Sequence, residues 1–325
     1  MLIKLDESDL ASCSYAISPM IETHLGLRLL SGIDPAGVLR PWVERHRPRL
    51  AELRHTDPHV NALIALFRKG GYNADFLLPP PVGPHGTFAE ELAGLRATPP
   101  ALARTEIGCT LDGHRRPSAE TQRILDGPDV VDRLADAMEA VWRQLIEPEW
   151  SRLRAVLQRD IVQRAGRLAA YGWGAAVDQL HPRVTWAGGG ITLGISDRDT
   201  YQVAGQGLML VPTVFGELVV RHKPPQPFTI VYRARGVADT IGPPSPPRDD
   251  ALGPLLGGGR ASVLRALAAP ATTSQLVAQL GLSLGTVSGH LSVLHGAGLV
   301  DRTRTGRSVT YAANDLGLSL LSART

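Results

Sequence analysis

The strongest structural signal in the sequence lies near the C-terminus: Thr272-Thr-Ser-Gln-Leu-Val-Ala-Gln-Leu-Gly-Leu-Ser-Leu-Gly-Thr-Val-Ser-Gly-His-Leu-Ser-Val-Leu-His-Gly-Ala-Gly-Leu-Val300. Thr272 or Thr273 can cap a first helix, because a threonine hydroxyl accepts hydrogen bonds from the N–H groups that open a helix. Gly281 can end that helix, since glycine adopts positive φ at no steric cost. Ser283 can then cap a second helix. The stretch therefore predicts two helices joined by a tight turn.

The second helix has one apolar face and one face of small and polar residues. Its leucines and valine at positions 284, 287, 291 and 294 recur at helical spacing, so we expect them to pack on the domain. An amphipathic helix over Ala261 to Ala269 is expected to complete that packing. The opposite face and its flanks form the predicted base-reading set, together with the cap: Ser283, Gly285, Thr286, Ser288, Gly289, His290 and Ser292. Serine and threonine hydroxyls contact any base, so this face predicts weak sequence readout.

A basic hairpin is expected after the second helix. The chain continues as Asp301-Arg-Thr-Arg-Thr-Gly-Arg-Ser-Val-Thr-Tyr311, which predicts arms over Leu299 to Thr303 and Ser308 to Ala312, with Thr305-Gly306 as the turn. Three arginines lie near its tip: Arg302, Arg304 and Arg307. A helix held on a second helix can enter the DNA major groove, and a cationic hairpin can bind the flanking phosphates. The pattern therefore predicts double-stranded DNA as the partner.

Residues 254–320 resemble the winged helix of the arsenic-repressor (ArsR) family of bacterial transcription regulators. Four segments carry the resemblance: Leu264-Arg-Ala-Leu, Thr273-Ser-Gln-Leu-Val-Ala, Thr286-Val-Ser-Gly-His-Leu-Ser-Val-Leu and Gly296-Ala-Gly-Leu-Val. The resemblance implies a transcription regulator that binds a pseudo-palindromic DNA operator as a homodimer.

The sequence departs from this family at the positions that bind metals. Metal-sensing members carry cysteine in the helix before the recognition helix, and Thr272 to Leu280 contains none. Other members use histidine and acidic ligands on a C-terminal helix, and the tail from Asp315 to Thr325 offers one aspartate. We therefore expect no metal and no cofactor. Gly289 also replaces the family's usual large cationic residue, which again favours weaker sequence readout.

The region upstream is predicted to be a separate α+β domain. Helical patterns cover Asp129 to Ile146 and Pro148 to Tyr171, and β-rich runs between Val184 and Tyr232 predict a small antiparallel sheet. Gly242-Pro-Pro-Ser-Pro-Pro247 marks a linker. The expected domains are a regulatory or dimerisation domain over 1–235, a Pro/Gly-rich linker over 236–253, and a winged helix-turn-helix over 254–325.

The upstream region also resembles, more loosely, an uncharacterised domain that precedes such winged helices. Three segments carry this resemblance: Tyr72-Asn-Ala-Asp-Phe-Leu-Leu-Pro-Pro-Pro, Pro148-Glu-Trp-Ser-Arg-Leu-Arg-Ala-Val-Leu and Gly205-Gln-Gly-Leu-Met-Leu-Val-Pro-Thr-Val-Phe. It implies no known activity, so a small-molecule effector, a partner protein and dimerisation stay open as roles.

The bulk composition fits a globular protein with a DNA-binding end. Hydrophobic residues make up 43% of the 325 positions, which is enough for a sizeable core. From Ala251 onwards the chain has six arginines and two acidic residues, whereas the whole chain carries only +3. Cys13 and Cys109 are too few for a disulfide framework. We find neither a leader pattern at Met1 nor a membrane-length apolar run, so a soluble, cytoplasmic location is expected.

The sequence favours a DNA-binding transcription regulator over two alternatives. One is an enzyme of unfamiliar type with a DNA-binding tether, and the other is a protein-interaction scaffold whose winged helix has no DNA affinity. We find no Gly-x-Ser-x-Gly motif, no Cys/His pair and no catalytic carboxylate pair, so no catalytic residue and no enzyme activity are predicted. His55 and His59 are four residues apart, but the intervening Pro58 predicts a helix break rather than a metal site.

Overall fold

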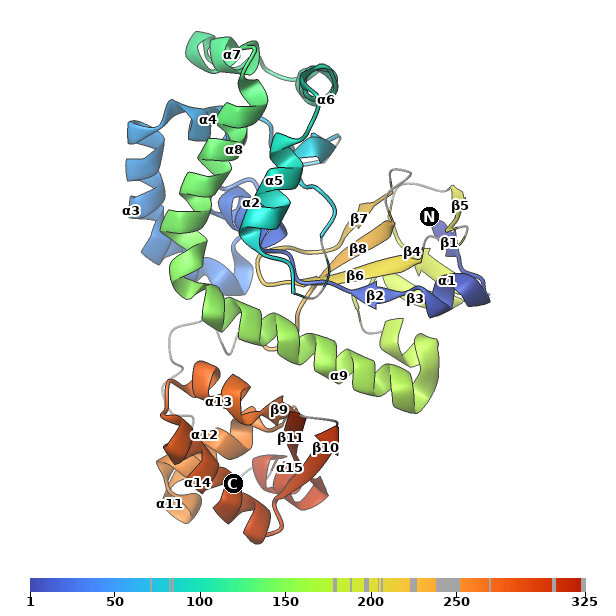
Figure 1. Cartoon of the computed structure of the whole chain (residues 1–325), viewed down its shortest axis with the longest axis vertical. Helices are drawn as coiled ribbons and strands as arrows, with labels where there is room; N and C mark the ends of the chain where they lie inside the picture. Colours follow the sequence, from blue (N-terminus) through green and yellow to red (C-terminus); the bar gives the residue numbers. More distant parts are fainter. Residues whose placement is uncertain are drawn as a thin grey trace. The chain divides into compact units, whose positions relative to one another are not determined.

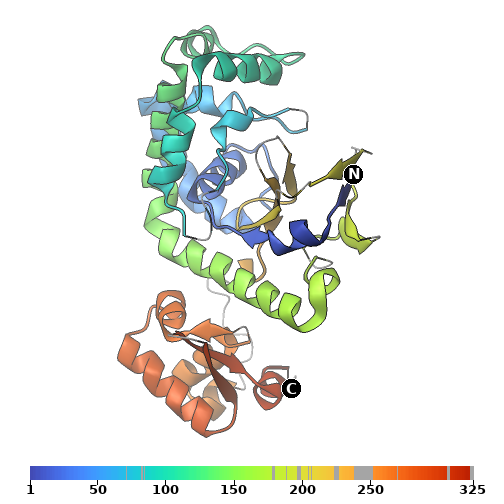
Figure 2. The same ribbon diagram turned by 45° about the vertical axis from the view of Figure 1, so that its right-hand side comes forward.

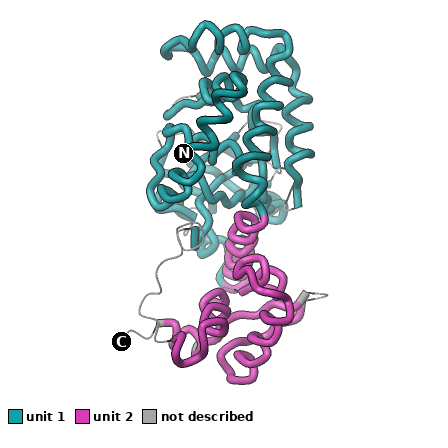
Figure 3. Tube along the Cα trace, turned by 90° about the vertical axis from the view of Figure 1, so that its left-hand side faces the viewer, with its two compact units in different colours: residues 1–150, 171–243 teal, residues 151–170, 244–325 magenta. Residues whose placement is uncertain are grey.

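The computed structural model describes the chain except for residues 71, 82, 84, 178–179, 188, 196–198, 204, 206, 223–226, 238–251, 269, 306–307 and 323–325, and except for the side chains of residues 305, 308, 315, 319 and 322. The chain forms two compact units, one of Met1–Trp150 with Tyr171–Pro243 and one of Ser151–Ala170 with Pro244–Thr325 (Figure 3). We call them the N-terminal and C-terminal units. Residues 238–251 of the predicted linker lie outside the described part of the chain.

The helices of the N-terminal unit begin at local signals in the sequence. Ser18 accepts a hydrogen bond from the Ile21 N–H at 2.9 Å, and Pro19 takes the first helical position of α2. His55 and His59 lie on different helices, because α3 ends before Pro58. The helices, shown in Figure 1, are α1 (Glu7–Ala11), α2 (Pro19–Leu30), α3 (Arg40–Thr56), α4 (Pro58–Ile64), α5 (Phe88–Arg96), α6 (Pro100–Leu111), α7 (Ala119–Leu125), α8 (Val130–Val141) and α9 (Trp150–Val177), of which residues 151–170 belong to the C-terminal unit. Short 3-10 helices, η1 (Gly37–Leu39), η2 (Asp75–Leu77) and η4 (Glu147–Glu149), and a π-helical turn, η3 (Trp142–Ile146), lie between them.

The strands of this unit form two four-stranded sheets. One has the order β3-β4-β1-β5 and the other β2-β6-β8-β7. Their bounds are β1 (Leu2–Lys4), β2 (Ser14–Tyr15), β3 (Val184–Ala187), β4 (Gly190–Leu193), β5 (Thr200–Gln202), β6 (Leu208–Thr213), β7 (Val219–Arg221) and β8 (Phe228–Arg233). The predicted α+β class is confirmed, but the sheets are mixed rather than antiparallel. Strand β8 inserts between β6 and β7, so it pairs parallel to β6 and antiparallel to β7.

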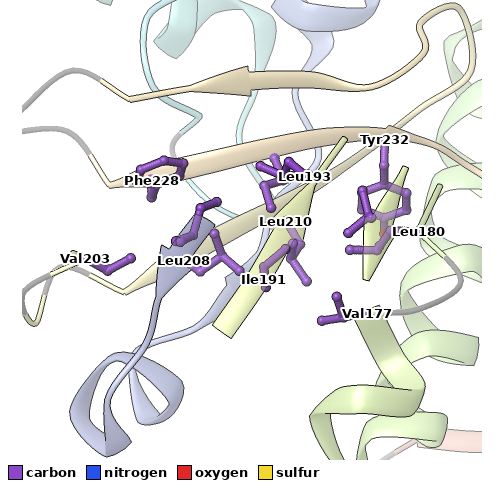
Figure 4. Packing of buried hydrophobic residues seen from close by; sticks show 12 residues of the cluster. Val177, Leu180, Ile191, Leu193, Val203, Leu208, Leu210, Phe228 and Tyr232 are labelled. Atoms are coloured by element: carbon purple, nitrogen blue, oxygen red, sulfur yellow. The ribbon is translucent and has the colours of Figure 1, made fainter. Parts of the chain in front are cut away.

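The two sheets share one hydrophobic core. Ile3, Ile191 and Leu193 come from the first sheet, and Leu208, Phe228 and Tyr232 come from the second; all six are at most 2% exposed. Figure 4 shows the labelled members of this cluster, with Val177 of α9 and the neighbouring Leu180 among them. Strands β6 and β8 are buried at nearly every residue, not only at alternate positions.

Helix α2 carries two buried titratable side chains, Glu22 and His24, and contacts a third, Glu91 of α5. The Val214 N–H, just after β6, donates to both carboxyl oxygens of Glu22, at 3.0 and 3.2 Å, and burial raises the pKa of Glu22 to about 8. Glu91 of α5 accepts from the Ser18 hydroxyl and the Met20 N–H, and burial raises its pKa to about 7. Burial lowers the pKa of His24 to about 3, so its imidazole is neutral at physiological pH. Hydrogen bonds to buried carboxyl groups thus connect α2 to α5 and to the end of β6.

The C-terminal unit is a small helical bundle with a three-stranded sheet (Figure 2). Besides residues 151–170 of α9, its elements are α11 (Leu252–Leu256), α12 (Gly258–Ala266), β9 (Ala271–Thr272), α13 (Thr273–Leu280), α14 (Leu284–Gly296), β10 (Val300–Thr305), β11 (Ser308–Ala313) and α15 (Asp315–Ser322). Leu264, Leu276 and Leu291 are at most 1% exposed and join α12, α13 and α14 in one core. The sheet order is β10-β11-β9.

Within the described residues, no single helix has the length and hydropathy of a membrane span; α13 and α14 pass that test only when joined across a bend of 117°.

Candidate nucleic-acid interface

Helices α13 and α14 form a helix-turn-helix whose turn is set by local capping. The Thr272 hydroxyl accepts from the Gln275 N–H, and the Gln275 side chain accepts from the Thr272 N–H, which is a capping box. Gly281 ends α13 at φ 66°, in the left-handed region that favours glycine. Ser283 caps α14. The predicted caps are confirmed, and the 117° bend lies in the range of DNA-binding helix pairs.

Three of the four predicted core positions of α14 face the interior. Val287, Leu291 and Leu294 are at most 1% exposed and pack in the core of the C-terminal unit. The prediction for Leu284 is wrong, because its side chain is 60% exposed. Leu284 is the first residue of the helix, and the core that covers the later turns does not extend over it.

The predicted open face of α14 is solvent-accessible. Its exposed members are Gly285, Thr286, Ser288, Gly289 and Ser292. A Cβ added at Gly289 would meet nothing within 4 Å, and one at Gly285 would meet only the Ser283 hydroxyl at 4.0 Å. Packing therefore does not require either glycine, although each destabilises the helix by about 1 kcal/mol relative to alanine. A helix surface without side chains at these positions can approach a groove closely.

His290 is placed differently from the other predicted contact residues. It is half-buried, and a Cβ added at Gly259 of α12 would come within 2.6 Å of its Nε2. The imidazole therefore lies against the first turn of α12, where a glycine leaves room for the ring. His290 thus packs on α12, whereas the other members of the predicted set are exposed.

Two hydroxyls at the start of α14 bond to each other. Ser283 Oγ accepts from the Thr286 N–H at 3.2 Å and lies 2.8 Å from Thr286 Oγ1. Both residues are exposed. Their hydrogen-bonding capacity is thus partly used within the cap, which leaves fewer free donors for a ligand at this end of the helix.

The hairpin after α14 has the two expected strands, and the first of them extends further than predicted, to Thr305. Thr305 pairs with Ser308, so Thr305 belongs to the first strand and not to the predicted Thr305-Gly306 turn, whose Gly306 lies outside the described residues. Arg302 and Arg304 are exposed and lie opposite Tyr311 and Val309. They are two residues apart on one strand, so their side chains leave the same side of the hairpin. Arg307, the third predicted phosphate-binding residue, lies outside the described residues.

The hairpin is attached to both helices of the pair. Thr310 of β11 pairs with Thr272, the residue that caps α13. The His295 ring donates from Nδ1 to the Val300 carbonyl oxygen at 2.8 Å, which joins the end of α14 to β10. The position of the wing relative to α14 is therefore determined by hydrogen bonds as well as by the core.

Among the described residues, no group of three or more histidine, cysteine, aspartate or glutamate side chains has the arrangement of a metal site. Cys13 is half-buried and burial raises its thiol pKa to about 11, which disfavours the thiolate that metals bind.

These features define the C-terminal unit as a winged helix-turn-helix domain. Residues 260–303 match a family of helix-turn-helix domains, and residues 104–238 match a family of unknown function (DUF5937). Both expected resemblances are thereby confirmed. The chain combines a helix-turn-helix domain with an upstream domain of uncharacterised type.

The helix-turn-helix region is similar to known regulators. Over 45 residues it is 53% identical to the HTH-type transcriptional regulator CmtR of Mycobacterium bovis, and equally to the CmtR of Mycobacterium tuberculosis. The match covers 14% of this chain and 38% of each regulator. No solved structure matches the chain.

Proposed function

We propose that this protein is a DNA-binding transcription regulator of the ArsR-like winged-helix type. One observation carries the proposal: α14 presents an exposed face of small and hydroxyl-bearing residues, and the same unit holds an arginine-bearing hairpin next to it. Helix α14 would enter the major groove with its N-terminal turns, and Arg302 and Arg304 would bind phosphates beside it. The similarity to the two mycobacterial regulators supports this reading.

We further propose that the protein binds its operator as a homodimer. Helix-turn-helix dimers place two recognition helices in successive major grooves, about 34 Å apart. An operator for such a dimer is pseudo-palindromic. A regulator of this kind acts on the chromosome, so we place it in the cytoplasm and assign it no catalytic role.

The upstream region, proposed as residues 1–235, would control the winged helix, proposed as residues 254–325. A ligand regulates only if it prefers one of two states of the protein, and tight binding by itself shifts no equilibrium. We propose a small organic effector rather than a transition metal, because Thr272–Leu280 contains no cysteine.

Selection from a randomised duplex pool tests the proposal. The full chain is incubated with the pool at fixed salt, and bound duplexes are recovered and sequenced over several rounds. The proposal expects enrichment of a motif with two related halves about one helical turn apart. A matched selection with Arg302→Ala/Arg304→Ala should recover the same motif less efficiently. A pool that stays random after selection contradicts the proposed function.

A further inference from the structure

We infer that Leu284 is a specificity-determining residue that contacts the C5-methyl group of a thymine in the operator. This inference rests on the proposed function. Leu284 is the first residue of α14, and its side chain is 60% exposed. The N-terminal residues of a recognition helix are the ones that reach base edges in the major groove.

The other side chains of this turn have little capacity to discriminate between bases. The hydroxyls of Ser283 and Thr286 are 2.8 Å apart and bond to each other. Gly285 offers only backbone, and Ser288, one turn further on, has a hydroxyl that can contact any base. The first turn of α14 also lacks arginine, asparagine and glutamine, the residues that read guanine and adenine through paired hydrogen bonds.

Leucine supplies a different kind of recognition. Thymine alone among the four bases presents a methyl group in the major groove, and apolar side chains pack against it. Leu284 precedes Ser288 by one helical turn, so the two side chains project from neighbouring positions of the helix. A leucine exposed to water in the free protein would bury part of its surface on such a methyl group. Losing one buried methyl contact weakens binding about fourfold.

Replacing thymine by uracil tests this contact, because uracil lacks only the C5-methyl group. The full chain is titrated with its selected duplex and with duplexes in which each thymine is changed to uracil in turn. We expect one or two positions in each half-site where uracil weakens binding about fourfold or more. With Leu284→Ala, thymine and uracil at those positions should bind equally.

Val293→Ala is the matched control. Val293 is also apolar, exposed and on α14, but it lies nine residues, or about 13 Å, further along the helix axis. This variant should keep the preference for thymine over uracil. Leu284 and Val293 are exposed, so both variants should retain the melting temperature of the native protein.

The outcomes separate this inference from the proposed function. If the chain selects a duplex but Leu284→Ala keeps the full thymine preference, the inference is overturned while the regulator stands. If uracil has no effect at any position on the native protein, the inference is also overturned. If no duplex is selected at all, the proposed function fails and the inference fails with it.

Discussion

Removing the two described wing arginines should weaken DNA binding in a way that depends on salt. Arg302 and Arg304 are exposed on one side of β10. Each cation that neutralises a phosphate contributes about 0.9 to the slope of log affinity against log salt concentration. Arg302→Ala/Arg304→Ala should therefore reduce that slope by about 1.8. Between roughly 50 and 200 mM salt, this difference changes the ratio of native to variant affinity about 12-fold.

Fluorescence anisotropy with a labelled duplex, repeated across salt concentrations, measures the slope. The loss should be the same on a selected duplex and on a shuffled one, because phosphate contacts carry no sequence information. Arg302→Lys/Arg304→Lys keeps both charges and should keep most of the slope. Arg265→Ala removes a cation from α12 of the same unit and should leave the slope unchanged. An unchanged slope in the double alanine variant would refute the assignment of the wing to phosphate binding.

Three further predictions concern specificity, pH and metals. Thr286→Ala should lower the preference for the operator by less than about 3 kcal/mol while non-specific affinity stays nearly intact; equal losses in a competition assay would show that this face is wrongly assigned. Glu22→Gln should weaken the pH dependence of stability. The pKa of Glu22 rises from 4.5 to about 8 on folding, so the folded chain holds a proton that the unfolded chain releases. The contribution of Glu22 to the free energy of unfolding is therefore retained at low pH and falls as pH rises towards 8, by up to about 1.4 kcal/mol per pH unit. Thermal unfolding of both proteins between pH 5 and 9 measures this dependence, and an equal dependence of stability on pH in the two proteins contradicts the prediction. Finally, zinc or a chelator should leave the DNA affinity of the full chain unchanged, since Thr272–Leu280 lacks cysteine, and zinc-dependent release would overturn the metal-free proposal.

Short-range signals made the C-terminal unit predictable. Capping by Thr272 and Ser283 and the left-handed Gly281 depend on residues at most four positions apart, so the sequence shows them directly. Periodicity also identified the buried stripe of α14 but failed at Leu284. A helical repeat indicates which side of a helix is apolar, whereas the point at which neighbouring elements stop covering that side depends on tertiary packing.

Long-range pairing accounts for the errors elsewhere. Thr305, predicted to lie in the turn of the wing, instead pairs with Ser308, because pairing register is not visible in a single strand. The sequence predicts an antiparallel sheet, but β7 joins at the outer side of β8. Strand β8 therefore lies next to β6 and pairs parallel to it. Helix α6 was not predicted, because its buried side consists of Ala103, Glu106, Ile107 and Thr110, which is too polar to show an apolar repeat. The placement of His290 against Gly259 is likewise a contact between residues 31 positions apart.

A competition titration of the full chain tests whether the protein recognises a specific DNA sequence. A labelled duplex recovered by selection is displaced at fixed salt by unlabelled copies of itself and by a shuffled duplex of equal length and composition. A transcription regulator should prefer its own site by about a thousandfold or more. Equal displacement by both duplexes would contradict the proposal that α14 reads sequence, and no binding to either would contradict the assignment of this protein as a DNA-binding regulator.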